Sequence, residues 1–422
     1  MKGLLTYHFT SKTIILCLSI LVCASILGSC FSNQKNSEAL KKVSGPTSQY
    51  VGSTSCKSCH AQIYDSYLQT AHFKSSSVVD EKNFDKIYKV PDSVFFKKDL
   101  FIKVQKDSSR YFQTAVSKGI NAVTRPFDLV IGSGRKGQTF LFWNDSAIYQ
   151  MPLSYSFTHK GWINSPGYPA DKVIFNRMVP SNCFECHATY ASQKVNDVQE
   201  EIYEKDKLVL SIACESCHGG GERHVNFHID NPTEKKARYI INTKNMNQKQ
   251  QLDACAVCHS GLRKNKKQPF SFVPGNNIDD YFEPSKSIKE GEELDVHGNQ
   301  YGLLTNSKCF KNSADMNCST CHNVHQNQRD NATFVQKCMS CHSENKKTFC
   351  TLRDTPKAIL IKKCINCHMP VKATNQIVFE TGIRKKLQSD SVRTHFIKVY
   401  NAKMTTLNLD NVKKYMHSFS AN

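Results

Sequence analysis

The chain has 422 residues, 19 of them cysteine and 16 histidine, and carries a formal net charge of +20 at pH 7. A basic excess of this size, taken alone, indicates nucleic acid or an anionic membrane as a partner. Most of the cysteines, however, fall in repeats of one pentapeptide whose chemistry accounts for much of the charge. Nucleic-acid binding is thereby excluded as the main function.

The N-terminal residues have the pattern of an export signal. Lys2 and Lys12 precede an apolar run over residues 13–27, which is too short and too closely followed by polar chain to indicate a membrane span. The run ends in Leu27-Gly28-Ser29-Cys30, which resembles the lipobox of bacterial lipoproteins and implies a lipid on Cys30. The alternative is an ordinary secretory signal in which the cysteines are incidental, namely Cys17, Cys23 and Cys30. Residues 1–29 are therefore assigned to the signal, and residues 30–50 to a flexible tether rich in Ser, Asn and Lys.

Seven copies of Cys-x-x-Cys-His dominate the rest of the chain. On a helical turn, positions i, i+3 and i+4 share one face, so a short segment presents two thiols and one imidazole together. This is the attachment motif of c-type haem, which needs two thioether bonds and a proximal iron ligand. Chance placement predicts roughly 0.03 copies. The motifs are Cys56/Cys59/His60, Cys183/Cys186/His187, Cys214/Cys217/His218, Cys255/Cys258/His259, Cys318/Cys321/His322, Cys338/Cys341/His342 and Cys364/Cys367/His368.

Two other uses of cysteine pairs compete with haem attachment. Structural zinc binds four Cys or His ligands, and exported chains often contain disulfides. Neither use requires a histidine directly after the second cysteine of every pair, and all seven pairs have one. The sequence therefore predicts seven covalent haems, numbered here 1 to 7 in chain order.

The haems also explain the charge. Removal of residues 1–29 takes away Lys2 and Lys12 and leaves +18. Each haem adds two propionates, so seven ferric haems bring the formal charge to about +11 and seven ferrous haems to about +4.

A single haem segment, residues 51–83, precedes a stretch predicted to be β-rich, residues 84–175. Apolar alternation over Leu100–Val104, a turn at Asp107-Ser108-Ser109 and a second apolar run over Tyr111–Val116 predict one hairpin. Thr139–Trp143, Asn144-Asp145 and Ile148–Met151 predict another. The Gly132–Gly137 segment lacks the P-loop ending and is interpreted as a basic hairpin turn.

Residues 176–422 hold the other six motifs and a C-terminal closing segment. About 31 residues per haem are too few for an ordinary apolar core, so the haems must supply much of the buried surface. The expected fold is a mostly α-helical or irregular multihaem cytochrome with short helices around covalent haems, plus the β-rich insertion. The apoprotein is expected to be largely unfolded.

Eight histidines outside the motifs and the signal form a pool of second axial ligands. The first candidates are His72, His224, His325 and His395; His228 and His297 follow, and His159 and His417 are weaker. The three-residue spacing from His322 aims His325 at a neighbouring haem. Met369 follows His368 directly, so packing explains it better than ligation. Two cysteines remain outside the motifs, Cys309 and Cys350. They are expected either to form a disulfide or to be inert buried thiols.

Several segments resemble the multihaem cytochromes of the cytochrome c-552/4 type, which include a tetrahaem electron carrier and relatives of hydroxylamine oxidoreductase. They are Tyr50-Val51-Gly52, Thr70-Ala71-His72, Ala213–Gly221 with His224, Cys318–His325, and Cys367–Pro370. The resemblance implies His72, His224, His325 and His395 as distal ligands, and haems packed in close pairs. The Cys-x-x-Cys-Lys motif of the nitrite-reducing relatives is not found in the sequence.

Two functions follow from these observations. The first is an exported, lipid-anchored heptahaem cytochrome that relays electrons between redox partner proteins, in the periplasm or at the cell surface, through mostly bis-His haems. The alternative is an oxidoreductase acting on a small nitrogen or sulfur oxyanion at one open haem, with Arg135 or Lys136 in a basic pocket.

Overall fold

The computed structural model describes residues 50–88, 94–97, 99–168, 172–284, 294–350, 357–381 and 386–400. All of them belong to one compact unit, Pro46–Asn422. The predicted signal, Cys30, the tether up to residue 49 and His417 lie outside the described residues. In the described part of the chain, none of the helices combines the length and apolar character needed to cross a bilayer.

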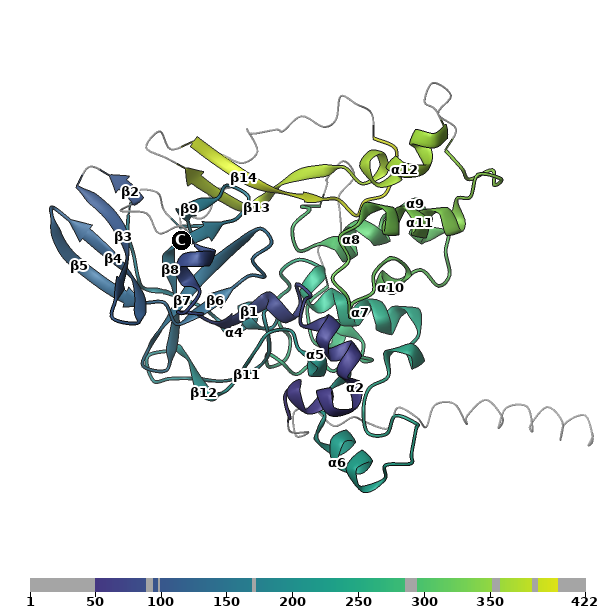
Figure 1. Ribbon diagram of the computed structural model, residues 1–422, viewed down its shortest axis with the longest axis horizontal. Helices are drawn as coiled ribbons and strands as arrows, with labels where there is room; N and C mark the ends of the chain where they lie inside the picture. The colour runs from purple at the N-terminus through teal and green to yellow at the C-terminus, as the bar shows by residue number, and fades with distance from the viewer. Residues whose placement is uncertain are drawn as a thin grey trace, which may run out of the picture. The chain divides into compact units, whose positions relative to one another are not determined.

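Two antiparallel sheets occupy residues 76–178 (Figure 1). The larger sheet has the order β1-β6-β7-β8-β10, with β9 also paired to β8, and the smaller has the order β2-β3-β4-β5. Their strands are β1 (Ser76–Val78), β2 (Val94–Lys97), β3 (Leu100–Asp107), β4 (Arg110–Ser117), β5 (Ile120–Pro126), β6 (Leu129–Ile131), β7 (Gly137–Asn144), β8 (Ala147–Ser156), β9 (Gly161–Asn164) and β10 (Arg177–Met178).

Both predicted hairpins are present. β3 pairs with β4 around Ser108, and β7 pairs with β8 around Asp145; both turn residues have positive φ, 56° and 55°. Short polar side chains such as these tolerate tight turns because they can form hydrogen bonds with the nearby backbone. The Gly132–Gly137 segment connects the paired strands β6 and β7, as the interpretation of a hairpin turn requires.

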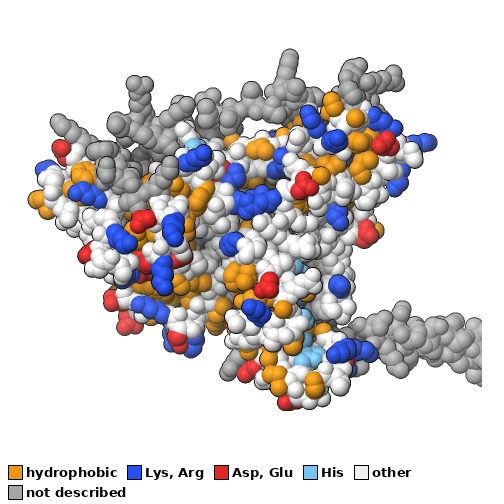
Figure 2. Space-filling view, viewed as in Figure 1, with side chains coloured by type: hydrophobic (Ala, Val, Ile, Leu, Met, Phe, Trp, Pro, Cys, Tyr) orange, Lys and Arg blue, Asp and Glu red, His pale blue; other side chains and the backbone are white. Residues whose placement is uncertain are grey.

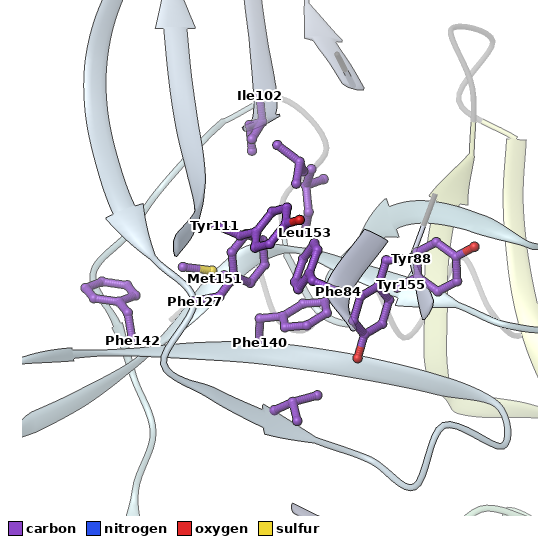
Figure 3. Packing of buried hydrophobic residues seen from close by; sticks show 12 residues of the cluster. Phe84, Tyr88, Ile102, Tyr111, Phe127, Phe140, Phe142, Met151, Leu153 and Tyr155 are labelled. Carbon is purple, nitrogen blue, oxygen red and sulfur yellow. The ribbon is translucent and has the colours of Figure 1, made fainter. Parts of the chain in front are cut away.

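The main hydrophobic core lies between these two sheets (Figure 3). Ile102, Val104 and Tyr111 come from the smaller sheet, and Phe140, Met151 and Leu153 come from the larger one. Phe84, on the short helix α3 (Phe84–Ile87), is fully buried and stacks on Tyr111 with ring centroids 4.0 Å apart. This part of the chain therefore has the alternating, apolar-inward pattern that stabilises packed sheets without a cofactor.

The rest of the described chain contains short helices and two separate hairpins. The hairpins pair β11 (Ala188–Val195) with β12 (Glu201–Leu210) and β13 (Val371–Thr381) with β14 (Lys386–Arg393). The helices are α2 (Thr54–Tyr67), α4 (Ser181–Phe184), α5 (Cys214–His218), α6 (Glu222–Asp230), α7 (Gln248–His259), α8 (Gln300–Thr305), α9 (Lys308–Lys311), α10 (Cys318–Cys321), α11 (Asn331–Cys341) and α12 (Lys357–His368), with 3-10 turns at Phe73–Ser75, Thr243–Asn245 and Ile278–Asp280.

The mostly α-helical expectation is wrong in one respect: strands occupy about as much of the described chain as helices. The β-rich part begins at Ser76 rather than residue 84 and ends at Met178. Two more hairpins lie within the region expected to be helical or irregular. Both hairpins contain register shifts, which interrupt the regular alternation from which strands are predicted.

Core residues are sparse among the helices. The cluster beside α7 contains three buried side chains, Ala256, Ile278 and Phe282, whereas the cluster between the sheets contains twelve. Around motif 2, a cluster of eight buried side chains that includes Phe184 packs against the larger sheet. Beside α7 side chains provide much less buried apolar surface, as expected if haems complete the core there.

Candidate haem sites

The seven motifs lie mostly on or at the end of short helices. α7 ends at His259 and α12 ends at His368, while α5 consists of one motif, Cys214–His218. The start of α7 is fixed by a capping box, in which Asn247 and Gln250 each accept a hydrogen bond from the other's backbone N–H. Local sequence thus places the thiols and imidazole of a motif within one turn, as haem attachment requires.

Four motif histidines lie opposite a histidine from elsewhere in the chain. The ring centroids are 6.4 Å apart for His60 and His224, and 6.2 Å apart for His218 and His325. The separations are 6.2 Å for His322 and His395, and 6.0 Å for His72 and His259. The first three pairs have nearly parallel rings, at 10–27°, and the fourth is close to perpendicular, at 77°.

These separations fit two imidazoles on one iron. A metal–imidazole bond is about 2 Å long and the ring centroid lies roughly 1 Å beyond the nitrogen, so two such ligands have centroids about 6 Å apart. Each pair therefore leaves the space of one metal ion between its rings.

Backbone carbonyls hold several of these histidines in the tautomer that binds iron. Nδ1 of His218 donates to the Ile241 carbonyl at 2.8 Å, and Nδ1 of His224 donates to the Arg238 carbonyl at 2.7 Å. His342 and His368 make the same bond to the carbonyls of Thr348 and Lys398, respectively. A carbonyl only accepts, so the proton is on Nδ1 and Nε2 is free to coordinate a metal.

Burial keeps the candidate ligands neutral. It lowers the pKa of His72 and of His395 to about 4, with neighbouring histidines adding to the effect. Neutral imidazole is the form that binds iron, so these sites are ready to coordinate near pH 7. Burial is also the largest cause that lowers the pKa of six other histidines: His187, His224, His259, His297, His322 and His325.

Within the described residues, the other histidines form no such ring pair with a motif histidine. His297 adds to the lowering of the pKa of His187, for which burial is the main cause, and it stays the candidate distal ligand of haem 2. His228 contacts His224 rather than a motif histidine, with ring centroids 4.7 Å apart. His159 is exposed and packs against Phe379. In the described residues no histidine ring contact is found for the two remaining motif histidines, His342 and His368.

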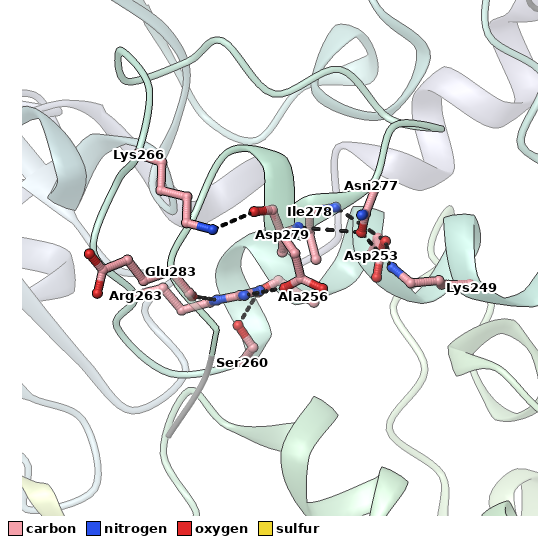
Figure 4. A network of polar contacts seen from close by, with 10 residues as sticks. All are labelled: Lys249, Asp253, Ala256, Ser260, Arg263, Lys266, Asn277, Ile278, Asp279 and Glu283. Carbon is pink, nitrogen blue, oxygen red and sulfur yellow. Dashed lines mark hydrogen bonds and ion pairs between the residues drawn. The ribbon is translucent and has the colours of Figure 1, made fainter. Parts of the chain in front are cut away.

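A polar network surrounds the helix that carries motif 4 (Figure 4). Asp253, on α7, is buried and accepts bonds from Lys249 at 2.5 Å and from the Ile278 backbone at 3.2 Å. Beyond the motif, Arg263 bonds to Asp279 at 2.7 Å and to the Glu283 carbonyl at 2.7 Å. These bonds fix α7 against the following loop and so hold the proximal histidine of motif 4 in position.

Glu215, inside motif 3, connects three segments. Its carboxylate is 3% exposed and accepts backbone hydrogen bonds from Val51 and Gly52 at 2.9 Å and from Gly221 at 2.8 Å. Val51 and Gly52 lead into motif 1, and Gly221 begins the helix that carries His224. One carboxylate therefore positions motif 1 and the histidine opposite its proximal ligand. The sequence offered no signal for this role, since Glu215 is one of the variable positions of its motif.

Replacing Glu215 with Ala is expected to destabilise the protein by about 3 kcal/mol or more, because hydrogen bonds to a charged group are worth about 1.5–3 kcal/mol each. The thermal unfolding midpoint should fall, and haem 1 should gain a high-spin component as His224 loses its position. Glu215→Gln should give an intermediate result, because one amide oxygen can still accept. Glu283→Ala, at an exposed carboxylate, is the control; an equal effect there would refute the assignment.

Thiols of different motifs touch one another. The Cys56 and Cys214 side chains are in hydrogen-bond contact, as are Cys186 with Cys258 and Cys255 with Cys318. Cys217 contributes to raising the pKa of both thiols of motif 4, and Cys364 and Cys321 contribute to raising the pKa of Cys338, so these thiols lie within electrostatic range of one another. These attachment points thus form one connected series rather than isolated sites.

Cys59, the second predicted attachment residue of motif 1, does not join this series. It is exposed and free, and the contact found for its Sγ within the described chain is with the hydroxyl of the adjacent Ser58, at 3.9 Å. α2 is interrupted at His60 (φ −120°, ψ 37°), and the contact with motif 3 is made by the other thiol of motif 1, Cys56. An exposed thiol remains accessible to a haem vinyl group, so attachment at Cys59 stays a prediction.

The remaining predicted residues have other neighbours. Cys309 and Cys350 are free thiols, near Cys341 and Cys364 respectively, so the disulfide is not formed in the structure and stays a prediction. The Lys136 ammonium group donates hydrogen bonds to the Asp390 carboxylate at 3.2 Å and to the Ser391 carbonyl at 2.9 Å. Its partners in the structure are therefore groups of the protein itself. Within the described residues no group of three or more His, Cys, Asp or Glu side chains forms a metal site of the zinc type.

Comparison with protein families agrees with the motifs. The family model described as cytochrome c554 and c-prime matches residues 55–98 and 171–219, which include motifs 1, 2 and 3. The crystal structure of the outer cell wall cytochrome OcwA is similar, with a TM-score of 0.49 and 17% identity over 83% of this chain and 79% of that chain. No curated protein matches.

The motifs and the family match define the class of the protein. It is a multihaem c-type cytochrome, and the chemistry of this class is electron transfer by covalently bound haem c.

Proposed function

We propose that the chain is an exported heptahaem cytochrome that relays electrons through mostly bis-His haems. The observation that carries the proposal is the set of four histidine pairs with ring centroids 6.0–6.4 Å apart. Two imidazoles close the coordination of an iron, and a closed iron passes electrons without binding substrate. His297 is proposed as the fifth distal ligand, opposite His187.

The thiol contacts support an order for the relay. Haem 1 would adjoin haem 3, haem 3 would adjoin haem 4, and haem 4 would adjoin both haem 2 and haem 5. Haems 6 and 7 would continue from haem 5 through Cys338. The relay is thus a branched line with haem 4 at the branch. Haem c supplies the redox chemistry, while the protein holds the axial imidazoles, fixes their tautomers and excludes water.

Export and lipid attachment at Cys30 complete the proposal. They are supported by the signal pattern of residues 1–29 and the lipobox resemblance, and they would place the relay on the periplasmic side of a membrane or at the outer membrane. The partners would then be redox proteins.

The alternative function is an oxidoreductase with one open haem. Haem 6 and haem 7 are the candidates for that open site. In the described residues these two show only their motif histidine, and His417 lies outside that part of the chain. A small nitrogen or sulfur oxyanion would bind directly to such an iron.

Electron paramagnetic resonance of the ferric protein tests both functions. The relay predicts low-spin signals throughout. Because the relative orientation of two axial imidazoles sets the splitting of the iron d orbitals, haem 4, with its perpendicular pair, should differ from haems 1, 3 and 5. A high-spin signal that shifts on adding nitrite, hydroxylamine or cyanide would favour the enzyme. A mass increase short of seven haems would refute the heptahaem assignment.

A further inference from the structure

Lysines concentrate at one end of the proposed relay. They lie on α9, α11, the turn after α11, and α12, and all are exposed; we call them the basic region: Lys308, Lys311, Lys337, Lys346, Lys347, Lys362 and Lys363. α11 packs on α12, and Cys309 on α9 lies close to Cys341 at the end of α11. Figure 2 shows Lys and Arg side chains outnumbering acidic ones over this end of the unit.

The charge is more unbalanced here than around haems 1 and 3. Residues 331–350 and 357–368 contain six lysines and one acid, Glu344, which pairs with Lys357 at 2.7 Å. Residues 214–246, around haems 1 and 3, contain five basic and four acidic residues. Some lysines in other segments have carboxylate partners, for example Lys249 with Asp253 and Lys194 with Glu204. For the seven lysines of the basic region, no ion pair is found within the described residues.

Haem propionates do not cancel this excess. The two segments have a formal charge of +5, and two ferric haems would reduce it to about +3. The lysines therefore exceed what haems 6 and 7 need as counter-charge. Cys341, His342 and Cys367 are exposed, as are cysteines of motifs 1, 2 and 3, so it is the local excess of lysine that singles out haems 6 and 7.

We propose that the basic region is the docking surface for an acidic redox protein, which exchanges electrons with the relay through haems 6 and 7; this rests on the proposed function. Charge around an exposed redox group steers a partner of opposite sign and raises the association rate. Such encounters need only a small interface, which fits a surface of lysines with few exposed apolar side chains. An anionic bilayer would also attract lysines, and binding to anionic vesicles distinguishes that alternative in the test below.

The test measures reduction of the ferric holoprotein by a reduced flavodoxin of strongly negative charge, in stopped flow, at about 10 mM and about 0.2 M salt. The variant replaces Lys346, Lys347, Lys362 and Lys363 with Gln. Its matched control replaces four exposed lysines of the β-rich part with Gln: Lys86, Lys118, Lys160 and Lys172. Haem content and the ferric spectrum establish that both variants are intact.

The basic-region variant is expected to lower the low-salt rate about tenfold and to flatten its salt dependence, while the control changes the rate less than about twofold. Equal losses in both variants would show that net charge alone matters and would overturn the proposal. A second outcome would also overturn the proposal: the variant keeps the wild-type rate but no longer binds phosphatidylglycerol vesicles. That result would assign the lysines to membrane binding. If the haems of the wild-type protein do not exchange electrons with one another after reduction, the proposed relay function is refuted, rather than the docking surface.

Discussion

Replacing His72 with Ala is expected to convert haem 4 to a high-spin site while every haem stays attached. His72 lies opposite His259 with ring centroids 6.0 Å apart, and no other histidine ring is found in contact with His259 in the described chain. Loss of the distal imidazole leaves the iron with one axial protein ligand, and the thioether bonds of Cys255 and Cys258 are untouched. One low-spin signal should therefore disappear and a high-spin signal should replace it.

The effect on electron transfer should be large because haem 4 is the proposed branch point. Electrons entering at haem 1 would have to cross a haem whose potential and reorganisation have changed. Added imidazole should restore the low-spin signal by occupying the vacated position. His159→Ala is the matched control, since His159 is exposed and contacts Phe379 rather than a motif histidine. An unchanged spectrum for His72→Ala would refute the pairing.

The second large effect concerns the protein made without haem attachment. The helical part should lose its structure, because beside α7 side chains provide a cluster of three buried residues, whereas the sheets enclose twelve. The β-rich part should remain folded, because its core needs no cofactor. Far-ultraviolet circular dichroism should show a loss of helix, and limited proteolysis should leave a resistant fragment covering about residues 76–178.

Phe140→Ala provides the control for that experiment. Phe140 is fully buried between the sheets and contacts Phe127 and Trp162, so its truncation should cost about 3–5 kcal/mol. In the apoprotein this loss should abolish the resistant fragment. Uniform digestion of the unmodified apoprotein would show that the sheets depend on the haems as well.

The structure changes the expectation for the apoprotein. Composition and haem density alone predicted a chain largely unfolded without its cofactors. The packed aromatic residues around Phe84 and Phe140 show that one part has an ordinary core. That part was predictable as strands, since apolar alternation over Leu100–Val104 is a local signal. The pairing of its two sheets was not, because it depends on contacts between segments far apart in sequence.

The sequence by itself predicted the cofactor attachment and the proximal ligands. Two thiols and an imidazole within five residues meet on one helical turn whatever the rest of the chain does, so motif chemistry is local. It also determined the pool of distal histidines, because each is visible as a residue outside the motifs.

Only the tertiary structure decided which histidines meet and which thiols are covered. Both sheets and motifs 2 and 3 separate His60 from His224 in sequence, and His325 lies beside motif 5 but faces His218 of motif 3. Cys56 and Cys59 belong to one motif, yet Cys56 contacts motif 3 and Cys59 is exposed. Such contacts arise from the packing of distant segments, and a ring separation of about 6 Å leaves no periodic trace in the chain.

The hydrogen bonds that hold the sites were equally hidden. The buried carboxylate of Glu215 and the carbonyls of Ile241 and Arg238 each accept from a group that the chain brings back from another segment. Any residue supplies a backbone carbonyl, so no residue type marks such a partner in the sequence. The local chemistry of the haem motifs could therefore be predicted, whereas their mutual arrangement depended on the fold.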